Sequence, residues 1–91
     1  VIFVSLVVDR RGHLAAEPQM STHGLVDPTI AEEQEIIEDL ENEIEDIFVD
    51  MAVEDRADDA FIAEEVRIGV RKQAAMIFRF RPRVFVHVTR V

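Results

Sequence analysis

An acidic stretch with an internal apolar repeat is the feature that most restricts how this chain folds. Ten carboxylates lie between Glu32 and Asp50. Apolar residues recur among them at alternating spacings of three and four, namely Ile37, Leu40, Ile44, Ile47 and Met51. That spacing is typical of one face of a helix. The segment therefore predicts a helix with one buried stripe and an otherwise charged, solvated surface.

A second helix supplies the partner for this stripe. It is expected to begin with Asp58 or Asp59 as its N-cap and to run to about Phe78. Its inward face is expected to carry Ile62, Val66, Val70, Ala74 and Ile77. Pro82 forbids any further helix beyond this point. The sequence therefore predicts two helices that pack against each other through their apolar stripes.

The start of the first helix has two candidate caps. Asp27 or Thr29 is expected at the N-cap, with Pro28 tolerated in the first turn. Thr29 and Glu32 also have the spacing of a capping box, in which each side chain satisfies a backbone amide near the other.

Three segments have the composition of strands. Residues 1–8 are mostly β-branched, which favours a strand that is buried in the middle of a sheet. Gly12 suits a tight turn, after which residues 14–20 form a return strand that Pro18 restricts to a sheet edge. The last segment alternates apolar and other residues, with Val84, Val86 and Val88 on one side and Phe85, His87 and Thr89 on the other.

The predicted fold class is α+β. It has two layers, a three-stranded sheet with both helices on one face, in the order β-β-α-α-β. A chain of 91 residues supports one domain, over residues 1–91. Because a buried strand opens the sequence at Val1, we expect a domain excised from a longer protein.

Charge and composition narrow the possible functions. Every acid except Asp9 lies between Gly12 and Glu65, whereas residues 66–91 carry only basic charges. The net charge of −9 opposes long-range attraction of polyanions. The absence of cysteine excludes disulfides, thiolate metal sites and a cysteine nucleophile, and it suits a reducing cytoplasm. The opening apolar run is too short to span a bilayer, so no membrane partner is expected.

Metal sites are not favoured by the sequence. The imidazoles of His13, His23 and His87 come from separate segments and would need a fourth ligand such as Asp27 to hold zinc. The acidic run over residues 41–46 lacks the glycine and the ligand spacing of a calcium loop. We therefore expect no catalytic residue, no metal and no cofactor in this chain.

Two surfaces are candidates for contacts with other molecules. Arg79, Arg81 and Arg83 alternate with Phe78 and Phe80. These arginines could contact RNA phosphates, or form ion pairs with the acidic helix or another subunit, and the second alternative is favoured. The predicted strands carry apolar side chains on both faces of the sheet, but the two helices can cover only one face. An interface with another domain or subunit is therefore predicted at Phe3, Phe85, Val84, Val86 and Val88.

The sequence resembles the C-terminal domain of ribonuclease J, of the metallo-β-lactamase and β-CASP ribonucleases, in three pieces. The first is Val4-Ser5-Leu6-Val7-Val8-Asp9 with Gly12, the second is Ser21-Thr22-His23-Gly24-Leu25-Val26 before an acidic helix, and the third is Arg81-Pro82 before a final strand. Arg83 and Val86 depart from the residues usual in the family, as does Phe78-Arg79-Phe80-Arg81.

The resemblance implies a non-catalytic domain that supports subunit or domain assembly. The parent would be a cytoplasmic hydrolase that cleaves RNA as an exonuclease from the 5′ end and as an endonuclease, in RNA processing and degradation. Its two divalent ions, expected to be zinc, would be held by an upstream His-x-His-x-Asp-His motif, which is missing here. Its partners would be a second copy or the catalytic domains, with RNA reached through the parent. The alternatives are a free-standing acidic protein-interaction module and an accessory domain that contacts RNA.

Overall fold

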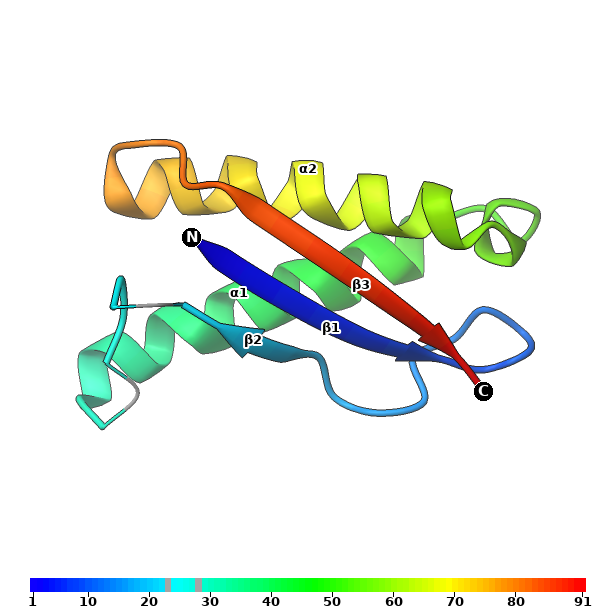
Figure 1. Cartoon of the computed structure of the whole chain (residues 1–91), viewed down its shortest axis with the longest axis horizontal. Coiled ribbons are helices and arrows are strands. Elements are labelled where there is room, and N and C mark those ends of the chain that lie inside the picture. Colours follow the sequence, from blue (N-terminus) through cyan, green and yellow to red (C-terminus); the bar gives the residue numbers. More distant parts are fainter. Residues whose placement is uncertain (23, 28) are drawn as a thin grey trace.

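The chain folds into a sheet layer and a helix layer (Figure 1). The structure is a computed structural model that describes residues 1–22, 24–27 and 29–91. Its elements are β1 (Ile2–Val8), β2 (Gln19–Ser21), α1 (Ala31–Asp50), the 3₁₀ helix η1 (Asp55–Ala57), α2 (Asp59–Phe78) and β3 (Val84–Arg90). The predicted α+β class and the β-β-α-α-β order are confirmed.

The three strands form one mixed sheet in the order β2-β1-β3. β1 lies in the middle, as its β-branched composition predicted. It is antiparallel to β2, with Val4 opposite Met20, and parallel to β3, with Val4 opposite Val86. Because β3 returns after two helices, it lies alongside β1 in the same direction and becomes the long edge of the sheet.

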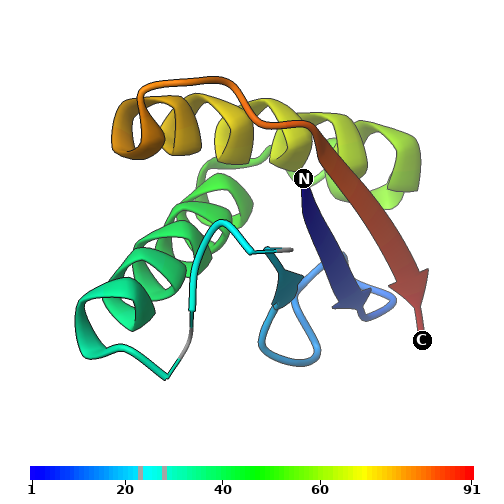
Figure 2. The same ribbon diagram turned by 60° about the vertical axis from the view of Figure 1, so that its left-hand side comes forward.

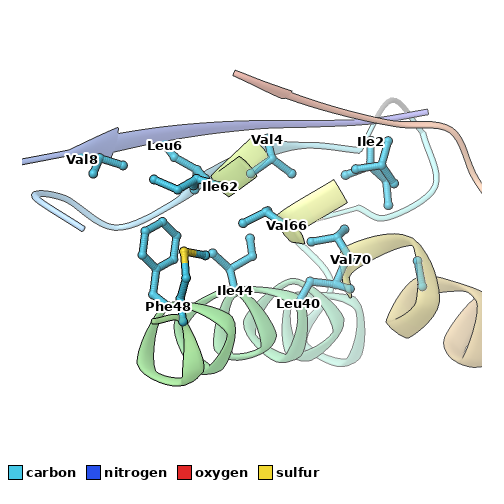
Figure 3. Close-up of a cluster of buried hydrophobic side chains, with 13 residues drawn as sticks. Ile2, Val4, Leu6, Val8, Leu40, Ile44, Phe48, Ile62, Val66 and Val70 are labelled. Atoms are coloured by element: carbon cyan, nitrogen blue, oxygen red, sulfur yellow. The ribbon is translucent and has the colours of Figure 1, made fainter. Parts of the chain in front are cut away.

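Both helices cover the same face of the sheet, and the core lies between the layers (Figures 2 and 3). Alternate residues of β1 point into this core and are almost fully buried: Ile2, Val4, Leu6 and Val8. The helices contribute buried residues to the same core: Leu40, Ile44 and Phe48 from α1, and Ile62, Val66, Val70 and Ala74 from α2. The apolar stripes expected from the sequence therefore form the core.

Gly69 explains how closely the two helices approach. A Cβ atom at this position would lie 2.4 Å from Cδ1 of Ile47 on α1. Any side chain larger than hydrogen would push the helices apart or force Ile47 out of its place.

The start of α1 differs from the prediction. The helix begins at Ala31 with Ile30 at the N-cap, and no side chain of the described residues caps it. The hydroxyl of Thr29 donates a hydrogen bond to Oδ1 of Asp27 at 2.7 Å, and the backbone N–H of Thr29 donates a second one to the same oxygen at 2.9 Å. The predicted cap and capping box are wrong because the two candidate caps bond to each other in a turn ahead of the helix. Pro28 lies outside the described residues.

The limits of α2 agree with the sequence. Asp58 is the N-cap, and its carboxylate accepts a hydrogen bond from the Phe61 backbone N–H at 3.1 Å. The helix ends at Phe78, and Arg79 takes a left-handed conformation with φ of 65°. Its backbone N–H bonds the carbonyl of Ala75, which closes the last turn.

The return strand is shorter than predicted. Pairing between β1 and this segment starts with an isolated bridge from Val8 to Leu14 and resumes only at Gln19. Pro18 has no N–H to donate to the ladder, so the chain loops out before it. The segment forms an edge strand, as predicted. The observed strand covers Gln19–Ser21, whereas residues 14–20 were predicted.

Candidate interaction surfaces

The sheet face away from the helices is open and only partly apolar. Phe3 and Phe85 stack on it from neighbouring strands, with ring centroids 5.2 Å apart and 20° between the ring planes. They are 43% and 48% exposed. Their neighbours on this face include Ser5, His87 and Thr89, which are exposed and polar. The apolar part of the open face is therefore a small aromatic patch.

The predicted interface valines lie on the other face of β3. Val84 is buried, and Val86 and Val88 are partly buried against the core. The period of two along a strand explains this, because Phe85 points outward and its neighbours must point inward. The side chains of these valines therefore contribute to the core and add nothing to the open face.

The backbone of the same valines lies on the free edge of the sheet. Ile2 donates its N–H to the carbonyl of Arg83, and Val91 donates to the carbonyl of Val8, both at 2.8 Å. In a parallel ladder, these bonds fix Phe85, His87 and Thr89 as the residues of β3 that bond to β1. The N–H and C=O groups of Val84, Val86, Val88 and Arg90 then point away from β1. No strand of the described chain lies on that side.

A row of cations flanks the start of this edge. A hollow of about 380 Å³ is lined by Arg67 and Arg71 of α2 and by Arg83, Val84 and Phe85. A second hollow, of about 440 Å³, shares Arg67 and Arg71 and adds Arg81. Two of the three arginines singled out from the sequence thus join a basic surface with α2.

The predicted ion pairs of these arginines with the acidic helix are not observed. Within residues 1–22, 24–27 and 29–91, Arg79, Arg81 and Arg83 form no ion pair. The two nearby phenylalanines differ in burial but stay in ring contact: Phe78 packs against the core and Phe80 is 51% exposed, with ring centroids 6.0 Å apart. The left-handed turn at Arg79 directs the following segment away from α1.

Arg90 forms an extensive polar contact that sequence reasoning missed. Its guanidinium donates to the backbone carbonyls of Asp9 and Arg56, each at 2.8 Å, and to Oδ1 of Asp59. It therefore ties the end of β3 to the turn after β1, to η1 and to the start of α2. An arginine that ends an alternating strand carries no local signal of such distant partners.

Arg56 of η1 caps the far end of α1. Its Nη2 donates to the carbonyl of Phe48 at 2.6 Å and to that of Val49 at 3.4 Å. The last turn of α1 has no basic residue of its own, so this cation is supplied from the next element. Its Nε is buried without a hydrogen-bond partner.

Hydrogen bonds lower the pKa of three exposed carboxylates, those of Asp9, Asp27 and Glu64. Backbone N–H groups of His13 and Arg11 donate to Asp9, which lowers its pKa, with the bond from His13 as the largest cause. The guanidinium of Arg67 donates two hydrogen bonds to the carboxylate of Glu64 and lowers its pKa. Glu41 behaves in the opposite way: partial burial, followed by the nearby acids Glu17, Glu38 and Glu45, raises its pKa.

The described residues do not form a metal site. No group of three or more histidine, aspartate or glutamate side chains is arranged to hold an ion among them. His13 lies in the turn after β1 and His87 on the open face of β3, whereas His23 lies outside the described residues. Among the described helices, none has the length and apolarity to cross a membrane.

These features define the class of the protein: a small two-layer α+β domain with a free strand edge and a basic flank. A family model described as the ribonuclease J C-terminal domain matches residues 1–91, which is the whole chain. The chain belongs to the ribonuclease J C-terminal domain family, as the resemblance implied. No match is found among curated proteins. The ribonuclease J family is generally metal-dependent, but the described residues of this domain contain no set of side chains that could hold a metal ion.

Proposed function

We propose that this domain assembles a ribonuclease J-like enzyme by joining two copies of itself along β3. The observation that carries the proposal is the free edge formed by the backbone of Val84, Val86 and Val88. An unpaired strand edge is a template for another strand, and soluble proteins usually cover or interrupt long ones. The edge here is seven residues long, and Phe85 of the exposed aromatic patch stands on the same strand.

A second copy is the occupant that suits this edge best. Two identical strands related by a two-fold axis pair antiparallel and satisfy each other's backbone groups. Arg71 of α2 lies with Arg83 beside the start of β3, whereas Asp59 lies beside its end and is paired there with Arg90. Antiparallel pairing therefore keeps the two basic flanks at opposite ends of the paired edge, each beside an Arg90–Asp59 pair of the other copy.

The catalytic work of the parent would be done elsewhere. Hydrolysis of RNA, from the 5′ end and internally, would use two divalent ions held by residues outside this chain, in the cytoplasm. The domain would contribute by holding the catalytic domains of two subunits in a fixed arrangement, so RNA would be reached only through the parent.

A pair of substitutions at Val86 tests this assembly. Val86→Pro removes an N–H that points to the free edge and leaves pairing with β1 intact, because that N–H does not bond to β1. Val86→Thr is the matched control: it keeps the N–H and the β-branched shape but loses similar apolar packing. Molar mass is measured by light scattering after size-exclusion chromatography over a range of concentrations, with far-UV circular dichroism to check the fold.

The expected result is a dimer for the unchanged chain and for Val86→Thr, and a folded monomer for Val86→Pro. A strict monomer at every concentration for the unchanged chain contradicts the proposal. A dimer that survives in a folded Val86→Pro chain also contradicts it, since the contact must then lie elsewhere. Binding of the monomeric chain to separately prepared catalytic domains would instead indicate that the edge pairs within the parent.

A further inference from the structure

The outer face of α2 carries a groove that the proposed strand pairing does not use. It is lined by Ile68, Lys72, Ala75 and Met76, with Arg81 from the following loop and with Arg67 and Arg71 along the side nearer β3. The helix turns by about 100° per residue, so Ile68 lies nearly opposite the core residues Val66 and Val70. The groove faces away from the sheet and has a volume of about 440 Å³.

The walls of this groove are basic and largely unpaired. Among the residues that the structure describes, none with a carboxylate lines the groove. In the part of the chain that the structure describes, Arg67 bonds Glu64 at 2.6 Å, whereas Arg71, Lys72 and Arg81 form no ion pair. A ligand with several negative charges would gain three cationic partners without breaking an existing contact.

The floor of the groove is apolar and exposed. Ile68 is 47% exposed and Met76 is 69% exposed, and Ala75, seven residues after Ile68, lies on the same side of α2. Methionine side chains adapt to differently shaped apolar partners. A purely polar ligand would leave this surface uncovered, so the occupant must combine negative charge with apolar side chains.

We infer that the groove binds an acidic amphipathic helix of a partner protein. Such a helix would lay leucine-like side chains on Ile68 and Met76 and point its flanking carboxylates at Lys72, Arg71 and Arg81. RNA is the less suitable occupant, because the net charge of −9 repels polyanions and no aromatic ring lines the groove for base stacking. The inference does not depend on the pairing of β3, which uses the strand edge and shares only Arg67 and Arg71 with the groove.

A binding assay with two probes tests the inference. The first probe is a labelled synthetic peptide of about 18 residues, with leucines at helical spacing and glutamates on the flanks. A scrambled peptide of the same composition is its control. The second probe is a short single-stranded RNA. Lys72→Glu with Arg81→Glu alters the groove and leaves the rim arginines shared with β3 unchanged. Arg10→Glu with Arg11→Glu, on the turn after β1, makes the same change in net charge away from it.

The amphipathic peptide should bind more tightly than the scrambled one, and the groove variant should weaken it at least about tenfold. The variant on the turn should have a much smaller effect, and Met76→Ala should weaken binding severalfold. Equal effects of the two charge variants, or no binding of the peptide, overturn the inference. Tighter binding of the RNA that is lost in the groove variant overturns it as well and makes the groove an RNA site. Val86→Pro should retain peptide binding, so failure of strand pairing and failure of the groove are distinguishable.

Discussion

Replacing Arg90 by alanine tests whether the end of β3 is held by its side chain. The guanidinium bonds two backbone carbonyls, those of Asp9 and Arg56, and the carboxylate of Asp59. Three separate segments therefore depend on one residue. Arg90→Ala should loosen the turn after β1, η1 and the start of α2 together.

The magnitude follows from the kind of each contact. A hydrogen bond from a charged donor contributes about 1.5–3 kcal/mol, and effects within one network are not additive. The ion pair contributes less, about 0.2–1 kcal/mol, because its side chains are 25% and 47% exposed. Arg90→Ala should therefore lower the free energy of unfolding by about 2–4 kcal/mol, and Asp59→Asn by less than about 1 kcal/mol.

Urea unfolding followed by far-UV circular dichroism measures both changes, since the chain has no tryptophan or tyrosine to report by fluorescence. The double variant should lose about as much stability as Arg90→Ala alone. Equal losses for Arg90→Ala and Asp59→Asn would refute the reasoning, because the carbonyl contacts would then contribute nothing.

Three further substitutions probe other contacts. Gly12 and Gly24 have φ values of +81° and +84°, but a Cβ at Gly12 would lie 2.2 Å from Cβ of Arg56, whereas none of the described residues comes within 4 Å at Gly24. Gly12→Ala should therefore destabilise by about 2–5 kcal/mol and Gly24→Ala by about 1–2 kcal/mol in urea unfolding, and equal losses would contradict the steric reason. Because the pKa of Glu41 is raised from 4.5, its charged form opposes folding at neutral pH. Glu41→Gln should raise the urea midpoint near neutral pH, and a gain that persists below pH 4.5 would contradict this.

The elements with strong local patterns could be predicted from the sequence. The β-branched run of β1 and the helical spacing of Ile62, Val66 and Val70 both reflect burial, which acts on every residue of an element. Asp58 was one of two candidate caps, and the structure selects it. The burial of the core face follows from these patterns without knowledge of the tertiary structure.

Features that depend on distant partners could not be predicted in this way. Thr29 had the spacing of a cap, but its hydroxyl bonds Asp27. The inward direction of Val84, Val86 and Val88 depends on which face of β3 meets the helices, and an alternating strand with apolar residues on both sides does not determine this. The contacts of Arg90 join residues far apart in the chain. Sequence alone shows that such an arginine is present, but its partners depend on the completed fold.

Amide hydrogen exchange, resolved by residue with NMR, tests the pairing of β3 most directly. The N–H groups of His87 and Thr89 bond to β1 and should be protected at every protein concentration. Those of Val86 and Val88 point to the free edge, so their exchange should slow as the concentration rises and a second copy covers them. Fast exchange of both valine amides at concentrations where the chain is dimeric would contradict the account.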